Sequence, residues 1–321
     1  MTRVLVTGAG GPAGVSIIRS LRARPGVDVV AADMDRYASG LYLVEERHLV
    51  PAGLAPEFTD SLLQLCIDEK IDVLFPTVDV ELEVIAARRA EFANEGIMIA
   101  SPQAETLEVC LDKYLLAQRC QGVLPVPTTA LLGPESDAID WAFPVMVKPR
   151  RGAGSRGIHQ IDSREALTAL GTDDQILVQE FLPGEEFSVD VIADLDGNVI
   201  AAVPRSRLRV DSGVSVAGAT VRDEELESAA KAVATAIGLS TVANVQLRRN
   251  TNGRAALLEV NPRFPGAMPL TIAAGVDMPS LTLDLMLDEP VPASVDFREL
   301  TVVRYLEDVF IDASEIVGRA T

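Results

Sequence analysis

The first hundred residues alternate between short apolar runs and longer segments in which apolar residues recur every three or four positions. The short runs are typical of buried strands, and the longer period is typical of helices with one face against a core. Strands that alternate with helices predict a parallel, doubly wound sheet. The predicted strands are residues 4–6, 27–35, 71–79 and 97–102, and the predicted helices are residues 15–23, 57–70 and 81–96.

Beyond a helix predicted over residues 105–122, the pattern changes to strands in pairs. Asp196-Gly197 and Asn252-Gly253 each separate two apolar runs, and both dipeptides favour tight hairpins. An amphipathic helix is predicted between these hairpins, over residues 224–238. We therefore expect the fold class to be α/β plus α+β, with a boundary near residue 105. The paired strands are predicted at residues 143–149, 156–161, 175–181, 187–194, 198–204, 243–251 and 254–262.

The charge balance narrows the choice of partners. There are 47 acidic residues against 28 basic ones, a net charge of −19. Such a field repels nucleic acid and anionic membranes, so neither is an expected partner. Three cysteines without metal-type spacing, no leader-like start and no apolar run of about 20 residues predict a cytoplasmic protein.

A glycine-rich turn, Gly8 to Gly14, follows the first predicted strand, and Asp33 lies in the second. This spacing resembles a dinucleotide-binding fingerprint and, in part, the turn of the short-chain dehydrogenases. Such a dehydrogenase needs a tyrosine with a lysine four residues later, and none of the four tyrosines has one. We therefore interpret the turn as a tight connection or a substrate-side loop, and a dehydrogenase is disfavoured.

The segment LLEVNPRFPG, residues 257–266, holds the strongest chemical pattern. Side chains two apart on a strand share a face, so Glu259 and Asn261 project together. If Asn252-Gly253 closes a two-residue turn without a bulge, Gln246 lies opposite Glu259. Three oxygen donors on one face suit Mg²⁺ carried by a nucleotide, and Arg263 could steady a phosphoryl group. The alternative is a solvated polar hairpin face.

NVQL and LEVNPR resemble the ATP-grasp superfamily, in particular the carbamoyl-phosphate synthase large-chain branch, in which glutamine occupies the first metal position. The resemblance covers nearly the whole chain. It implies a Rossmann-like pre-ATP-grasp domain over residues 1–105 and an ATP-grasp domain of two α+β subdomains over residues 106–321, with a lid at about 145–180. Carbamoyl-phosphate synthase large chains carry two such halves, whereas this chain has one.

The same resemblance implies the nucleotide contacts. Lys113 and Lys148 would reach the phosphates, under a lid formed by Arg151, Gly152, Ala153, Gly154, Ser155 and Gly157. Gln179, Glu180, Phe181 and Leu182 would meet adenine, and Glu186 would accept hydrogen bonds from the ribose. The alternatives are an exposed helix lysine at 113, a strand-edge lysine at 148, and an ion pair between Glu186 and Arg207, which lie opposite each other if Asp196-Gly197 closes a tight hairpin.

The expected function is an Mg-ATP-dependent ligase that joins a small-molecule carboxylate to an amine through an acyl phosphate, forming a C–N bond. Lys148 and Arg263 are the expected catalytic residues, and Gln246, Glu259 and Asn261 the expected ligands of one or two Mg²⁺, with Mn²⁺ as a substitute. By resemblance, a homodimer is the expected assembly. The alternatives are a bicarbonate-phosphorylating subunit related to carbamoyl-phosphate synthase, or a nucleotide-binding module without catalysis.

Overall fold

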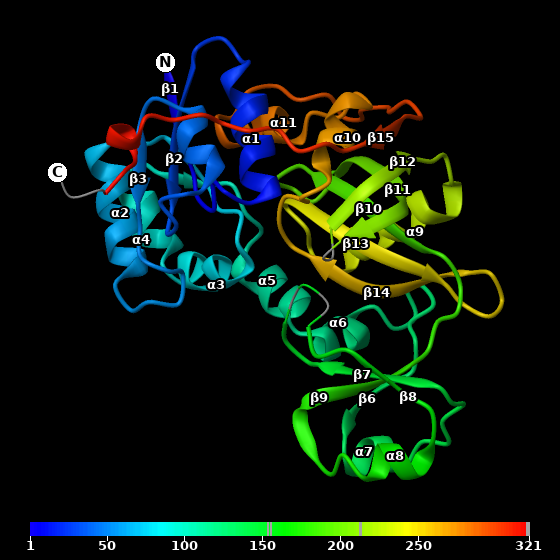
Figure 1. The fold of residues 1–321 in the computed structure, drawn as a ribbon. Coiled ribbons are helices and arrows are strands. Elements are labelled where there is room, and N and C mark those ends of the chain that lie inside the picture. The colour runs from blue at the N-terminus through cyan, green and yellow to red at the C-terminus, as the bar shows by residue number, and fades with distance from the viewer. Residues whose placement is uncertain (153, 155, 212–213, 319–321) are drawn as a thin grey trace.

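The computed structural model describes residues 1–152, 154, 156–211 and 214–318. Figure 1 shows three sheets: a parallel sheet at the N-terminus, a central antiparallel sheet, and a small sheet at the far end of the molecule. The parallel sheet has the strand order β3-β2-β1-β4-β5. Its strands are β1 (Thr2–Val6), β2 (Val27–Asp33), β3 (Arg47–Leu49), β4 (Val73–Phe75) and β5 (Met98–Ile99). The predicted doubly wound arrangement is confirmed, and the short edge strand β3 is an addition that the pattern did not reveal.

Helices connect these strands and cover the parallel sheet. Pro12 is the first residue of α1, a position whose backbone conformation proline already favours. Apolar residues of the strands are buried between the helical layers, as a parallel sheet requires. The connecting elements are α1 (Pro12–Arg22), η1 (Ser39–Leu43), α2 (Phe58–Asp68), α3 (Asp79–Ala87) and α4 (Arg89–Asn94).

The central sheet has the order β14-β13-β10-β11-β12-β15. One face packs on α9 (Glu224–Ala236) and forms its own apolar core, whereas the other face carries a row of polar side chains. That polar face is where the predicted metal ligands lie. The strands are β10 (Glu186–Ala193), β11 (Val199–Asp211), β12 (Val214–Thr220), β13 (Thr241–Arg249), β14 (Ala255–Asn261) and β15 (Thr301–Val303).

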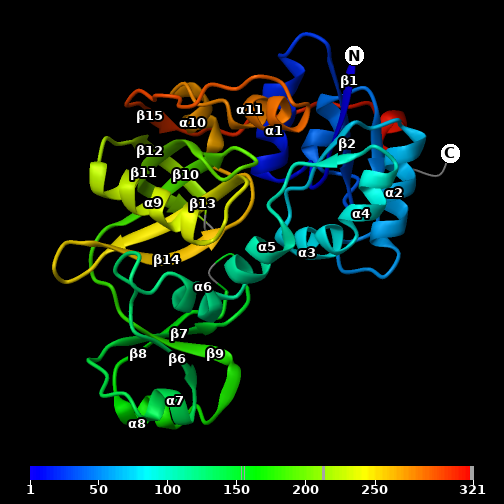
Figure 2. The same cartoon turned by 180° about the vertical axis from the view of Figure 1, so that it is seen from behind.

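The small sheet, called the lid here, has the order β6-β9-β7-β8 and a separate core around Trp141 and Val145. Two helices, α5 (Ala104–Leu111) and α6 (Lys113–Arg119), lead into it from the parallel sheet (Figures 1 and 2). Its elements are β6 (Thr129–Leu132), α7 (Pro134–Asp137), β7 (Val145–Pro149), β8 (His159–Ile161), α8 (Arg164–Thr168) and β9 (Asp173–Glu180).

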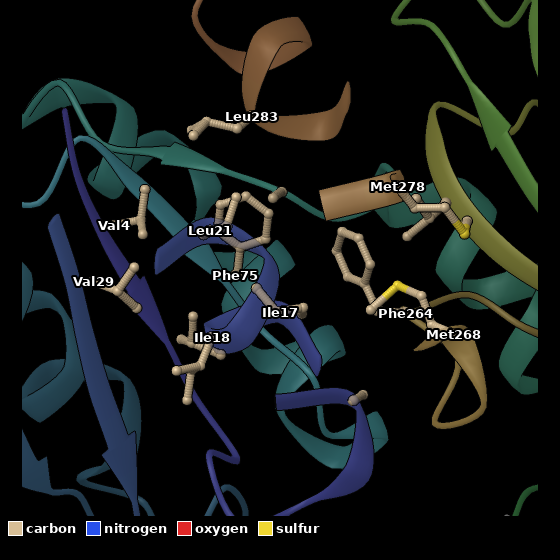
Figure 3. Close-up of a cluster of buried hydrophobic side chains, with 14 of the residues drawn as sticks. Val4, Ile17, Ile18, Leu21, Val29, Phe75, Phe264, Met268, Met278 and Leu283 are labelled. Carbon is tan, nitrogen blue, oxygen red and sulfur yellow. The ribbon is translucent and has the colours of Figure 1, made fainter. Parts of the chain in front are cut away.

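The C-terminal segment returns to the N-terminal sheet. In Figure 3, Phe264 faces Phe75, and their ring centroids are 5.7 Å apart. Met268, Met278 and Leu283 join the same core from α10 (Met268–Ala273) and α11 (Met278–Met286). The chain then runs back across the parallel sheet to η2 (Ala313–Glu315), as the red trace in Figure 1 shows. The first and last parts of the chain therefore share one hydrophobic core.

A buried carboxylate holds the polar face of the central sheet together. Asp190 accepts hydrogen bonds from Arg205 Nε (2.8 Å) and Nη2 (2.6 Å), from Asn244 Nδ2 (2.7 Å) and from Thr271. Arg205 and Asp190 are both nearly inaccessible to solvent. Removal of the carboxylate would leave a buried guanidinium without a counter-charge, which is strongly destabilising.

We therefore expect Asp190→Ala to lower the free energy of unfolding by about 3 kcal/mol, measured by urea denaturation. Asp140→Ala, at an exposed position, is the matched control and should change it by less than about 0.5 kcal/mol. Equal stability of the two variants would contradict a structural role for this network.

Candidate functional site

The candidate site lies on the polar face of the central sheet, beneath the lid. Gln246 on β13 is paired with Glu259 on β14, and Asn244 with Asn261, so the predicted cross-strand register is confirmed. The route to that register differs from the prediction. The turn is longer, because the amide of Asn250 donates to the carbonyl of Arg254 (2.9 Å), and a bulge beside Gln246 then restores the pairing.

The side chains around Glu259 gather several charges in a small volume. Asn261 Nδ2 donates to Glu259 Oε1 (3.3 Å), and Lys113 Nζ lies 3.7 Å from Glu259 Oε2. Lys113 Nζ also donates to the carbonyl oxygen of Gly152 (2.6 Å). Lys113 therefore links the sheet face that carries the predicted metal ligands to the glycine-rich loop of the lid. Two amide oxygens and one carboxylate form a hard, weakly charged donor set, which fits Mg²⁺ that arrives with polyphosphate.

Lys148 is a buried cation at the same place. It is 6% exposed, and its Nζ donates to Gln179 Oε1 (2.7 Å), whose amide Nε2 in turn donates to Thr129 Oγ1 (2.9 Å). Burial lowers the pKa of Lys148 to about 8, while the carboxylate of Glu259 raises it and the ammonium of Lys113 lowers it. A cation held in this way, which forms no ion pair with a carboxylate among the described residues, can accommodate an anionic group such as a phosphate.

The glycine-rich loop after β7 is anchored at its start. Arg150 Nε donates to Asp112 Oδ2 (2.7 Å), and Arg151 Nη1 donates to Glu83 Oε1 on α3 (2.8 Å). Gly152, Gly154 and Gly157 have positive φ values of 149°, 71° and 70°, which L-residues rarely adopt. The loop therefore follows a path that needs these glycines, and it lies close to the N-terminal domain. Ala153 and Ser155, also predicted lid residues, lie outside the described residues.

Arg263 points to the N-terminal domain. Its Nε and Nη2 donate to the two carboxylate oxygens of Asp79 at the start of α3, at 2.7 and 3.2 Å. This bidentate pair joins the end of β14 to the parallel sheet and fixes the orientation of the guanidinium. The predicted contact of Arg263 with a phosphoryl group stays a prediction, and Asp79 is the residue that positions it here.

The predicted adenine and ribose residues follow β9. The amide of Glu180 donates to the carbonyl of Thr128 (2.8 Å), and Leu182 is buried whereas Phe181 is half-buried. Glu186, at the start of β10, accepts a hydrogen bond from Arg207. The ion pair considered as an alternative is therefore present, and ribose binding by Glu186 stays a prediction. Gln179 is engaged on both polar atoms, by Lys148 and Thr129, and its contact with adenine stays a prediction.

Several residues of this site were not identified from the sequence. Asp79 and Glu83 lie on α3 of the N-terminal domain and contact Arg263 and Arg151, respectively. Asp112 caps α6 and binds Arg150. An acidic residue directly before a helix is a recognisable capping signal for Asp112. Nothing in the local sequence of α3 indicates that it faces residues so far along the chain.

No helix in the described ranges is long and apolar enough to cross a membrane.

Comparison with protein families matches residues 4–100 to "PylC-like, N-terminal domain" and residues 172–309 to "ATP-grasp in the biosynthetic pathway with Ter operon". A D-alanine–D-alanine ligase of Pseudomonas entomophila is 26% identical over an alignment of 285 positions, which covers 78% of this chain and 87% of that protein.

Solved structures share the whole arrangement. The biotin carboxylase domain of the 2-oxoglutarate carboxylase of Hydrogenobacter thermophilus superposes with a TM-score of 0.77 at 17% identity, over 94% of this chain and 73% of that one. An L-amino acid ligase of Bacillus licheniformis superposes with a TM-score of 0.68 at 18% identity, over 89% of this chain and 74% of that one. Residues 172–309 therefore match an ATP-grasp family and residues 4–100 a PylC-like N-terminal domain, and the fold of the chain is shared with solved biotin carboxylase and ligase structures.

Proposed function

We propose that this protein is an ATP-dependent ligase that activates a small carboxylate by phosphorylation and transfers the acyl group to an amino acid or a similar amine. A carboxylate oxygen attacks the γ-phosphorus of ATP, and the bond to ADP breaks. The amine nitrogen then attacks the acyl carbon, the bond to phosphate breaks, and the nitrogen loses a proton. The observation that carries the proposal is the convergence of Lys113, Lys148 and Glu259 on one polar sheet face under a glycine-rich loop.

The cationic residues and the oxygen donors of the site have different roles in this proposal. Lys113 and Lys148 bind and orient the phosphates, and the amides of the loop after β7 cover them. Gln246, Glu259 and Asn261 hold Mg²⁺, which supplies neutralisation of the phosphate oxygens when it is bound. Arg263 lies just beyond the end of β14 and is held by Asp79 against the N-terminal domain, where it can meet the substrate carboxylate.

The choice of an amino acid as amine rests on the relatives, which include a D-alanine–D-alanine ligase and an L-amino acid ligase. Small-molecule substrates fit this class of enzyme. The neighbour from Hydrogenobacter thermophilus is described as a domain dimer, and we extend a homodimer to this chain by analogy. Sedimentation equilibrium measures the assembly state, and a monomer at all concentrations would contradict the proposed homodimer.

The test is release of phosphate from Mg-ATP in the presence of a panel of carboxylates, each with and without a mixture of amino acids. Release that depends on one acid, and rises further with one amine, is expected. Mass spectrometry of the product should then show an amide. ATP binding without stimulation by any pair would contradict the ligase and favour a nucleotide-binding module without catalysis.

Bicarbonate belongs in the same panel. The superposed biotin carboxylase domain was solved with bicarbonate and MgADP, so a bicarbonate-phosphorylating enzyme is the second candidate. Phosphate release that depends on bicarbonate alone, with no response to organic acids, would favour it over the carboxylate–amine ligase.

The pH dependence should report Lys148. Its pKa of about 8 in the free enzyme means that the ammonium is lost as the pH rises through 8, so kcat/KM for ATP should fall above that pH. Bound triphosphate favours the charged form, so the kcat profile should fall at a higher pH than the kcat/KM profile. Coincident profiles, or a flat kcat/KM between pH 7 and about 9.5, would contradict the assignment.

A further inference from the structure

A cavity lies away from the catalytic face, where three parts of the chain meet. It has a volume of about 330 Å³. Its wall comes from α4 and β5 of the N-terminal domain, from the β10–β11 hairpin and the start of β13, and from the end of α11. Six residues that matter for its chemistry are Arg89, Met98, Leu195, Ser240, Thr241 and Met286. At roughly 30 Å³ per water-sized group, the space suits a molecule of about ten non-hydrogen atoms.

Three residues that line this cavity each carry a buried polar atom without a hydrogen-bond partner. In the described part of the chain, six buried side-chain nitrogen or oxygen atoms have no hydrogen-bond partner, and three of them are Arg89 Nε, Ser240 Oγ and Thr241 Oγ1. Ser240 and Thr241 are 7% and 1% exposed. Such atoms are costly when nothing binds them, and a ligand in the cavity that these residues line could supply the missing partners after small side-chain rotations.

Thr241 adds a second, independent observation. Its φ is +80°, a conformation that β-branched residues rarely adopt. Backbone strain of this kind persists where the surrounding structure enforces it, and it is found preferentially at binding sites. Here it places the threonine at the cavity at the start of β13.

Arg89 supplies a positive charge that no acidic residue neutralises. Its guanidinium donates to the carbonyl oxygens of Ile99 (3.1 Å), Ser101 (3.0 Å) and Pro102 (2.9 Å). No carboxylate lies within ion-pair distance of it among the described residues. The neighbouring Arg88, by contrast, is paired with both Asp60 and Glu91. Burial lowers the pKa of Arg89 through desolvation, with no compensating acidic group.

The rest of the wall is mostly apolar, with Ser101 and Gln103 as further polar residues, so the cavity combines one cation, several polar groups and an apolar surface. We propose that this cavity binds a small organic acid with an apolar body, whose carboxylate lies toward Arg89 while the body contacts Met98, Leu195 and Met286. Ser240 and Thr241 would turn about their Cα–Cβ bonds to donate to the same carboxylate. The occupant would then contact the N-terminal domain, the central sheet and α11 at once.

This site is separate from the catalytic one. Thr241 and Gln246 lie on the same strand, roughly 17 Å apart at about 3.3 Å per residue. A ligand at the cavity could therefore act on turnover only by changing how the domains are held, and the inference does not depend on the proposed reaction.

The test uses isovalerate and benzoate as probes, with isovaleramide and benzamide as neutral matches. Isothermal titration without nucleotide should give saturable binding of at least one acid with a Kd of about 1 mM or tighter, and binding of its amide at least about tenfold weaker. Leu195 is 53% exposed, so its substitution is tolerated by the fold. Leu195→Glu should weaken binding of the acid and Leu195→Lys should strengthen it, with at least about a tenfold difference between them.

Two further variants separate the explanations. Arg89→Met should abolish binding, whereas Arg88→Met at the adjacent, paired arginine should leave it unchanged. Glu259→Gln, at the catalytic face, should also leave it unchanged. Absence of saturation by both acids, equal affinity of the two Leu195 variants, or loss of binding in Glu259→Gln would each overturn the proposal, the last because the acid would then occupy the catalytic site.

Discussion

Replacement of Lys148 by methionine is expected to lower the rate of ATP-dependent phosphate release on the order of 10³-fold. Methionine keeps most of the length and apolar volume of the side chain but removes the ammonium. In the folded protein this ammonium is buried and held by Gln179, so its orientation is set before any phosphate arrives. A cation that is already desolvated and positioned stabilises transferred charge more strongly than one in water.

The fold should survive this change. Because burial lowers the pKa of Lys148 to about 8, the charged side chain is an unfavourable component of the empty protein, and methionine removes that cost. We expect the thermal midpoint to stay equal or to rise while activity is lost. Lys231→Met, at an exposed helix position, is the matched control and should keep full activity. A Lys148→Met enzyme within tenfold of the unmodified rate would exclude a catalytic role.

Glu259→Gln is expected to have the second large effect, a loss of 10²- to 10³-fold, equivalent to several kcal/mol of transition-state stabilisation. Glutamine has the same shape but no charge, so the hydrogen bond from Asn261 can persist while the attraction for a divalent cation is weakened. The apparent affinity for Mg²⁺, measured by titrating the metal at constant ATP, should fall with it.

Glu259→Gln is also expected to lower the pKa of Lys148. The carboxylate of Glu259 raises the pKa of Lys148, so its removal should shift the fall of kcat/KM to a pH below about 8. A merely structural role for Glu259 would lower activity without moving this profile. Glu224→Gln, on the exposed first turn of α9, is the control and should change neither quantity.

Local pattern was sufficient to predict the two fold classes and the catalytic strand. The register of Gln246 against Glu259 was predicted from the turn, although the real turn is longer and a bulge compensates for the difference. This register was robust because the apolar side of β13 and β14 must face α9, and a slip by one residue would bury Glu259. The pattern of burial therefore determines the pairing even when the turn is misjudged.

Contacts between distant segments could not be predicted in this way. Arg263 is followed by Phe264, and the phenylalanine packs on Phe75 of the N-terminal sheet. That contact places Arg263 next to Asp79. The periodicity of the sequence shows only that Phe264 is apolar; it does not show which surface Phe264 packs against. For the same reason, the sequence did not reveal that α10 and α11 pack against α1, or that Arg151 reaches α3.

The shared core of the two chain ends also has a consequence for biosynthesis. The N-terminal sheet and α1 leave the ribosome first, but the surface that holds Ile17, Leu21 and Phe75 is covered by Met268, Met278 and Leu283, which are made much later. Until those residues emerge, the nascent N-terminal domain presents an apolar face to solvent. Chaperone binding during translation is therefore expected to persist until synthesis has passed α11, and a ribosome stalled shortly before Met268 should leave an aggregation-prone chain.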